Sequence, residues 1–190
     1  EGYYCPENSQ ATHSEFLLCP AGYYCSSGLS IVCPEGTYMP NAGPNTNCLT
    51  CEPGYVCHQD LSNPVPITLP NGLCPKGYYC PGNNTNLIEI PCPSGTYNDR
   101  EAQISLEACK ECPAGVACVT AGLTEVPQNA DCEEGFYCLG GSTSQFPTDP
   151  LFDPAVTRSD GPCPAGYYCP ANTDFPIPCD KGTYNTEEQL

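Results

Sequence analysis

The residues best suited to chemistry in this chain are its eighteen cysteines, among 190 residues in all. Cysteines at close spacing serve three kinds of chemistry: zinc coordination, thiol–disulfide exchange, and structural disulfide bonding. The Cys-x2-Cys pairs at 48–51 and 109–112 suit the first two. Which of the three applies depends on the residues around these pairs and on the spacing of the other cysteines.

The partners that zinc or catalysis would need are missing from the sequence. A zinc knuckle needs a second Cys or His pair at regular spacing, and the only histidines are His13 and His58. A thiol oxidoreductase needs a helix N-terminus in an α/β fold, which nothing here predicts. The sequence contains no Gly-x-Ser-x-Gly, no phosphate loop and no calcium loop. We therefore predict no enzyme activity, no metal and no cofactor.

The cysteines fall into two repeated motifs, which point to disulfides. The first, here called a clasp, is Cys-x5-Cys; a truncated copy, EGYYC, occupies residues 1–5. Complete clasps begin at Cys19, Cys51, Cys74, Cys112, Cys132 and Cys163. The second, here called a long ring, starts Cys-x2-Gly-Thr-Tyr and begins at Cys33, Cys92 and Cys179. All cysteines and all thirteen tyrosines lie in these motifs, so internal repetition dominates the sequence.

Spacing leaves more than one disulfide pairing open. In the first register each motif closes on itself, giving Cys19–Cys25, Cys33–Cys48, Cys51–Cys57, Cys74–Cys80, Cys92–Cys109, Cys112–Cys118, Cys132–Cys138 and Cys163–Cys169. Cys5 and Cys179 then need partners outside the chain, as in a segment of a longer repeat array. A second register, starting Cys5–Cys19, uses every cysteine but demands Cys-x2-Cys bridges, which are more typical of redox sites. We favour the first register, with interleaved pairings as a further alternative.

Short turns and strands must position these cysteines. Proline suits the second position and glycine the fourth position of a type I turn, so Cys-Pro-x-Gly predicts a turn that starts at the cysteine. The tyrosines that follow should cover the disulfide of their own clasp. Two clasps depart from the pattern and should pack more loosely: 112–118 has Val116 and Ala117, and 132–138 lacks the proline. One helical turn is expected near residues 99–108.

The composition favours a fold held together by disulfides rather than by a large hydrophobic core. Leu, Ile, Val and Phe make up about 16 per cent of the residues, the net charge is −17, and there is no Trp. Each small disulfide ring contributes roughly 2–3 kcal/mol in a chain-entropy estimate, which substitutes for a core. We predict small disulfide-rich modules in tandem, with short β-strands and turns, little helix and no single hydrophobic core. The expected stretches are a partial clasp at 1–18, repeat units at 19–73 and 74–131, a lone clasp with a Pro-rich spacer at 132–162, and a truncated unit at 163–190.

Compartment and partners follow from cysteine density and charge. So many disulfides persist only in an oxidising environment, which predicts a secreted or cell-surface protein. The acidic balance excludes nucleic acid, no apolar run reaches the ~20 residues of a membrane span, and no signal peptide is visible. The sequon at Asn83 predicts an N-linked glycan, and the Ser142–Ser144 stretch suits O-linked glycans. In the spacer 139–162, the best candidates for a docking patch are Phe146, Leu151 and Phe152, and the alternative is that they fold back on the neighbouring clasps.

The pattern CPxGTY…CxxCPxG resembles the cysteine-rich repeats of tumour necrosis factor receptors and of ephrin-receptor-like modules. The interposed CPxGYYC looks like repeats of large cysteine-rich surface, flagellar-hair and fibril proteins of protists. The resemblance implies the pairs Cys33–Cys48 and Cys92–Cys109, and an elongated rod built unit on unit. We expect a structural segment of an extracellular filament, flagellar hair or cell coat that assembles with itself or with sister chains. The alternative is a ligand-binding or adhesive ectodomain of a receptor.

Overall fold

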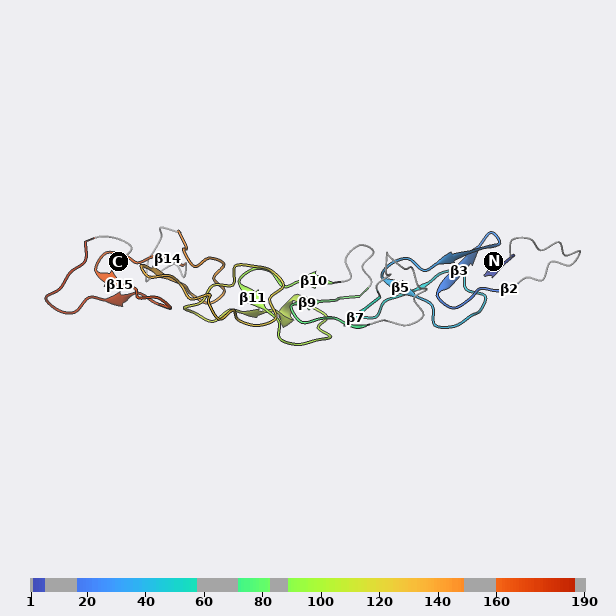
Figure 1. The fold of residues 1–190 in the computed structure, drawn as a ribbon, viewed down its shortest axis with the longest axis horizontal. Coiled ribbons are helices and arrows are strands. Elements are labelled where there is room, and N and C mark those ends of the chain that lie inside the picture. The colour runs from blue at the N-terminus through green and yellow to red at the C-terminus, as the bar shows by residue number, and fades with distance from the viewer. Residues whose placement is uncertain (1, 6–16, 58–71, 83–88, 149–159, 187–190) are drawn as a thin grey trace, which may run out of the picture. The chain divides into compact units, whose positions relative to one another are not determined.

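A computed structural model describes residues 2–5, 17–57, 72–82, 89–148 and 160–186 (Figure 1). The chain forms two compact units. The first comprises Glu1–Pro75, Tyr79–Ile90 and Glu101–Ser105, and the second comprises Lys76–Tyr78, Pro91–Arg100 and Leu106–Leu190. Each unit holds several motifs, so the module boundaries expected from the sequence stay a prediction. No helix in the described ranges is long and apolar enough to cross a membrane.

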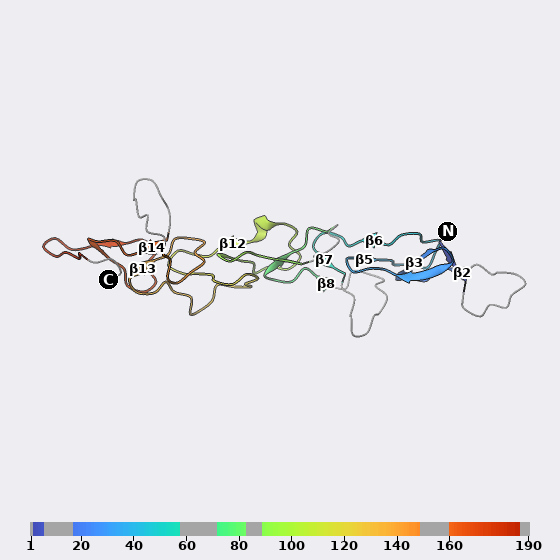
Figure 2. The same ribbon diagram turned by 90° about the horizontal axis from the view of Figure 1, so that it is seen from above.

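Nearly all regular structure consists of two-residue strands joined by irregular segments (Figures 1 and 2). The strands up to residue 73 are β1 (Tyr3–Tyr4), β2 (Leu17–Leu18), β3 (Tyr23–Ser26), β4 (Leu29–Val32), β5 (Thr37–Tyr38), β6 (Leu49–Thr50), β7 (Tyr55–Val56) and β8 (Gly72–Leu73). Those after it are β9 (Tyr78–Tyr79), β10 (Ile90–Pro91), β11 (Thr96–Tyr97), β12 (Lys110–Glu111), β13 (Phe136–Tyr137), β14 (Gly161–Pro162), β15 (Tyr167–Tyr168) and β16 (Ile177–Pro178). A 3-10 helix, η1 (Leu106–Ala108), confirms the expected helical turn.

A seven-residue frame describes every motif. Position 1 is the leading cysteine, position 4 the glycine, and position 7 the closing cysteine of a clasp or its equivalent in a long ring. In most frames positions 5 and 6 form one strand, and the two residues before the next frame form its antiparallel partner. Tyr55 and Val56, for example, pair with Leu73 and Gly72. Aromatic and β-branched residues at positions 5 and 6 favour this extended conformation. The result is a series of separate two-stranded sheets. In the frame 112–118 only an isolated bridge joins Val116 to Asp131, and Thr183 and Tyr184 belong to no strand.

The turn of each frame starts one residue later than the sequence predicts. The position-5 amide donates to the position-2 carbonyl, as from Tyr23 to Pro20 at 3.2 Å. Glycine is therefore the third residue of the turn, and Gly22 has φ 81°. A positive φ at that position is the signature of a type II turn, where glycine avoids the steric cost of a Cβ. The type I turn starting at cysteine is therefore wrong: proline occupies the second turn position only in the clasp 51–57, as Pro53.

Successive frames within each unit are joined by reciprocal backbone hydrogen bonds. In the second unit, the Gly95 amide donates to the Cys118 carbonyl at 2.7 Å, and the Cys112 amide donates back to the Gly95 carbonyl at 3.0 Å. In the first unit, the Gly36 amide donates likewise to the Cys57 carbonyl at 3.0 Å. Each frame is thus fastened to the next through its glycine, independently of the disulfides.

Buried apolar residues gather around disulfides rather than in one core. One cluster contains Cys51 and Cys57, with Tyr38 packed against it. Elsewhere Ala117, Cys132 and Cys138 form a cluster with Phe136, although these clasps were expected to pack loosely. That expectation is wrong because the small Ala117 methyl group lies fully buried against the bridge of the following clasp. The fold is therefore a set of small disulfide-rich modules in tandem, made of short strands and turns.

Candidate functional site

Disulfide bonds close the motifs locally. The structure forms Cys19–Cys25, Cys33–Cys48, Cys51–Cys57, Cys74–Cys80, Cys92–Cys109, Cys112–Cys118, Cys132–Cys138 and Cys163–Cys169. These are the pairs of the register in which each motif closes on itself. Cys5 and Cys179 carry free thiols; Cys5 is exposed and Cys179 is half-buried. The external partners expected for these two cysteines stay a prediction.

The two cysteines of each Cys-x2-Cys pair belong to different disulfide rings. Cys48 pairs with Cys33, whereas Cys51 pairs with Cys57, and the pair at 109–112 is divided in the same way. Neither pair therefore holds the free thiolates that zinc binding or thiol–disulfide exchange requires. Within the described ranges, no group of three His, Cys, Asp or Glu side chains could hold a metal ion.

The disulfides of the clasps 132–138 and 163–169 are each covered from two directions. Tyr137, at position 6 of its frame, is 1% exposed and packs against the next bridge, Cys163–Cys169. Tyr167, at position 5 of the covered frame, packs against the same bridge. The sequence predicts that the tyrosines cover their own disulfide, and this holds only for position 5. Position 6 covers the following disulfide because its side chain lies on the opposite face of the strand.

In two of the long rings an asparagine stands where a clasp has its closing cysteine, and its side chain is hydrogen-bonded to the preceding frame. We call this asparagine the latch; the sequence analysis did not predict it. Asn98, at position 7, is 1% exposed, and its Nδ2 donates to the Tyr78 carbonyl of the preceding frame at 2.8 Å. Its Oδ1 accepts from the Arg100 amide at 3.0 Å. Asn185 repeats the first bond, donating to the Tyr167 carbonyl at 3.1 Å. The shared sequence Gly-Thr-Tyr-Asn was the available signal; the third long ring has Met39 instead.

Threonine at position 5 is the second signature of the long rings. Thr96 Oγ1 donates to the Pro93 carbonyl at 2.7 Å, and the Thr96 amide donates to the same oxygen at 3.1 Å. Thr37 and Thr183 make the equivalent side-chain bonds, at 2.6 and 2.8 Å. The hydroxyl therefore reinforces the type II turn in rings whose disulfide closes 15 or 17 residues away instead of six.

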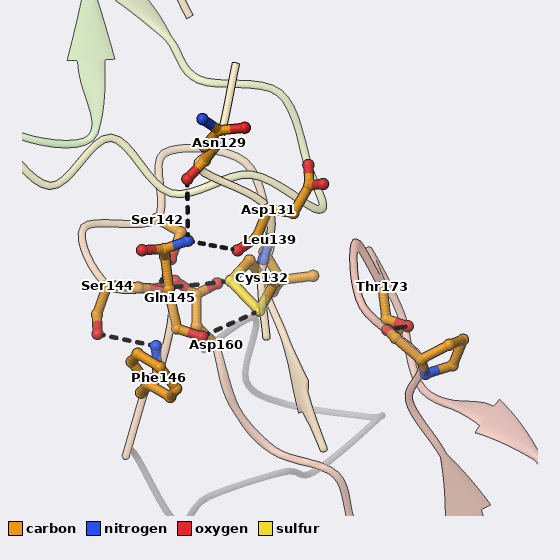
Figure 3. The surroundings of a disulfide bond; sticks show 12 residues. Asn129, Asp131, Cys132, Leu139, Ser142, Ser144, Gln145, Phe146, Asp160 and Thr173 are labelled. Carbon is orange, nitrogen blue, oxygen red and sulfur yellow. Dashed lines mark hydrogen bonds between the residues drawn. A yellow bond between two sulfur atoms is a disulfide. The ribbon is translucent and has the colours of Figure 1, made fainter. Parts of the chain in front are cut away.

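The segment after the clasp 132–138 wraps around its own disulfide (Figure 3). The Ser144 carbonyl oxygen lies 3.5 Å from Cys138 Sγ; neither atom carries a hydrogen, so this is a packing contact. Gln145 Nε2 donates to the Asp131 carbonyl at 2.8 Å and to the Asn129 carbonyl at 3.3 Å (Figure 3). Gln145 thus ties the segment to the residues that lead into the clasp.

The candidate contact residues of the spacer have separate outcomes. Phe146 stacks edge-on against Phe136 of the clasp, with ring centroids 5.7 Å apart, yet remains 56% exposed. Leu151 and Phe152 lie outside the described residues, as does the sequon at Asn83. Docking by this patch and glycosylation at Asn83 therefore stay predictions.

An ion pair links Asp99 of the long ring 92–109 to Lys110, the residue that directly follows the ring. Lys110 Nζ lies 2.7 Å from Asp99 Oδ1 and also stands over the Tyr97 ring, 5.7 Å from its centroid. The hydrogen bond from Lys110 holds the pKa of Asp99 below its ordinary value. Both charged groups are exposed, so the pair fixes local geometry more than it adds stability.

The sequence of this chain is similar to that of a known protein. No protein-family model matches the chain. It is 29% identical over 171 residues to the Cysteine repeat modular protein A of Toxoplasma gondii. The match covers 86% of this chain, and the chain spans 5% of that protein's length. Together with the repeated disulfides, the match supports describing this chain as a cysteine-rich repeat protein.

Proposed function

We propose that this chain is a structural segment of an extracellular repeat protein, stacked into a rod within a filament, flagellar hair or cell-surface coat. The observation that carries the proposal is the reciprocal bonding of each frame to the next, as between Gly95, Cys112 and Cys118. A frame bonded in this way adds length with each copy and needs no large core. In this proposal the segment has no enzymatic role. The filament forms when the chain assembles with copies of itself or with sister chains.

Extracellular placement is supported by the disulfides. Eight bridges among the described residues of a 190-residue chain require an oxidising compartment to form and persist. We further propose that the repeats are of the tumour necrosis factor receptor and ephrin-receptor-like type. This assignment is supported by the two long rings, which close at the spacing implied by the resemblance to such repeats.

A receptor or adhesin ectodomain is the second candidate, favoured by Phe146. An aromatic side chain that stays 56% exposed, on a segment anchored by Gln145, suits a partner contact. Such a chain would carry its ligand on the segments between frames rather than assemble with copies of itself.

Negative-stain electron microscopy of the protein isolated from its source, without reduction, separates the two candidates. Regular fibrils with a repeat of a few nanometres support the structural role and make the spacer 139–162 the first segment to test as the contact. Separate particles at the same concentration would overturn self-assembly as the main function. A reduced and alkylated sample serves as control, because it lacks the bridges that close each frame.

A further inference from the structure

In the second unit, position-4 glycines such as Gly77 and Gly95 are crossed by backbone from two frames further on. A Cβ on Gly77 would lie 2.3 Å from the Gly122 carbonyl oxygen, and one on Gly95 would lie 2.3 Å from that of Gly141. Both distances are too short for any side chain, so these crossings require glycine. The frames of Gly77 and Gly95 are thus joined to the next frame by hydrogen bonds and covered by the segment that follows the next frame but one.

Gly166 and Gly182 break this pattern. Each has the positive φ of the other frames, at 84° and 95°, but a Cβ on either would meet no atom within 4 Å. Both are exposed, whereas the position-4 glycines of the preceding frames are buried. Two backbone crossings seen elsewhere in the unit are therefore missing here among the described residues.

The position-6 tyrosines of the same two frames are uncovered as well. Tyr168 is 47% exposed and Tyr184 is 84% exposed, whereas Tyr137 is 1% exposed beneath the next clasp's bridge. Gly166 still donates to the Asn185 carbonyl at 2.9 Å and accepts from the Cys179 amide at 3.0 Å. No described residue bonds to the amide or carbonyl of Gly182. Gly166 therefore makes both hydrogen bonds of a junction between frames, whereas Gly182 makes neither of them with a described residue.

We propose that Gly166, Tyr168, Cys179, Gly182 and Tyr184 form an acceptor face for one further disulfide-closed Cys-x5-Cys motif, joined in series. The occupant follows from continuity with the junctions already in the unit. It supplies two extended residues to pair with Thr183 and Tyr184, a cysteine amide and a position-7 carbonyl for Gly182, and a bridge that covers Tyr184. Its trailing segment crosses Gly166. A flat apolar partner offers no such row of backbone groups.

Cys179 gains its partner from the same occupant. The other long rings close on a cysteine 15 or 17 residues after their first, placed just before the following clasp. On bond formation both thiols lose their protons, and two electrons pass to a disulfide oxidant such as oxidised glutathione, which becomes two thiols. This inference deepens the proposed structural role and rests on it, since the face is a stacking surface.

The test is a full chain extended after Leu190 by a copy of its own residues 105–123. The added segment supplies a cysteine within the spacing of the long rings, the lead-in residues Lys110 and Glu111, the clasp 112–118, and the crossing segment with Gly122. After oxidation in a glutathione buffer, peptide mapping should join Cys179 to the added copy of Cys109. Nitration of Tyr184 should slow by about tenfold or more as the ring becomes covered, and exchange of the Gly182 amide should slow with it.

Two matched variants of the extended chain make the test specific. Gly166→Ala should abolish the protection of Tyr184, because the new Cβ would collide with the added crossing segment as at Gly77. Gly28→Ala should preserve it: Gly28 has φ 80° and open space around its Cβ position, so it carries the same backbone strain away from the face.

The proposal is overturned if the added clasp closes its own bridge while Tyr184 and the Gly182 amide stay as accessible as in the original chain. Equal protection in the Gly166→Ala and Gly28→Ala variants would overturn it too. Neither readout depends on fibrils. An extended chain that protects Tyr184, from a protein that forms no fibrils at its source, would retain the acceptor face and reject the filament role.

Discussion

Replacing Asn98 with alanine should loosen the junction between the frames at 74–80 and 92–98. Asn98 is 1% exposed, and its Nδ2 donates to the Tyr78 carbonyl at 2.8 Å. The substitution leaves that carbonyl without its partner in a site where the lost side chain had excluded water. An orphaned buried group costs about 1–3 kcal/mol, whereas Arg100 is exposed and can donate to water instead. We therefore expect a loss of about 2 kcal/mol at this junction.

Native-state hydrogen exchange measures this loss locally, without assuming that a stapled chain unfolds in one step. The reporters are the Gly77 amide, bonded to the Asn98 carbonyl at 2.8 Å, and the Asn98-position amide, bonded to the Leu123 carbonyl at 2.9 Å. A loss of about 2 kcal/mol corresponds to roughly 30-fold faster exchange through local opening. Asn129→Ala, at an exposed asparagine of the same unit, should leave both rates unchanged.

A second substitution tests which half of the amide matters. Asn98→Asp keeps an acceptor for Arg100 but replaces the Nδ2 donor with an oxygen that faces the Tyr78 carbonyl. It should accelerate exchange at least as much as Asn98→Ala. If both variants exchange within about twofold of the original chain, the asparagine is not a latch, and the bonds between frames hold the junction without it.

Three further changes test other parts of the structure. Tyr137→Ala removes a buried ring from the following clasp's bridge at a cost of about 3–5 kcal/mol, so limited dithiothreitol should reduce that bridge faster; Tyr168→Ala should have little effect. Lys110→Gln should raise the pKa of Asp99 toward its ordinary value in an NMR titration; because the folded pKa is lowered, the pair stabilises above the ordinary Asp pKa and is lost as pH falls through the lowered value. An unchanged titration would refute the pairing. Mass spectrometry before and after glycosidase treatment should find a glycan at Asn83, and unmodified Asn83 throughout would reject that prediction.

The sequence anticipated the ring closures because they depend on local geometry. A clasp separates its cysteines by six residues, and a tight glycine turn between them brings the Cα atoms of Cys19 and Cys25 to 5.7 Å. The turn itself was misplaced by one residue because Cys-Pro-x-Gly fits a four-residue turn in two registers. Only the backbone bond from Tyr23 to Pro20, together with the positive φ of Gly22, selects the correct one.

The asparagine latch escaped prediction for a different reason. The residue stands in a visible pattern, Gly-Thr-Tyr-Asn, but the Tyr78 carbonyl it bonds lies 20 residues earlier in the chain. The looser packing expected at clasp 112–118 failed in the same way. Ala117 is small for covering its own bridge, yet it is well sized for the space against the following one.

The cysteine and glycine pattern by itself determined a stapled repeat fold, because each ring closes over a few residues and contains its own turn. Tertiary structure alone decided how the rings join. Tyr137, at position 6, covers the next disulfide, and glycines such as Gly77 and Gly95 are bonded to the next frame and crossed by backbone from beyond it. Spacers of different lengths separate these partners, so no fixed sequence interval encodes the contacts. They arise because a two-residue strand and a small ring can satisfy their backbone groups and cover their disulfide only against a neighbour.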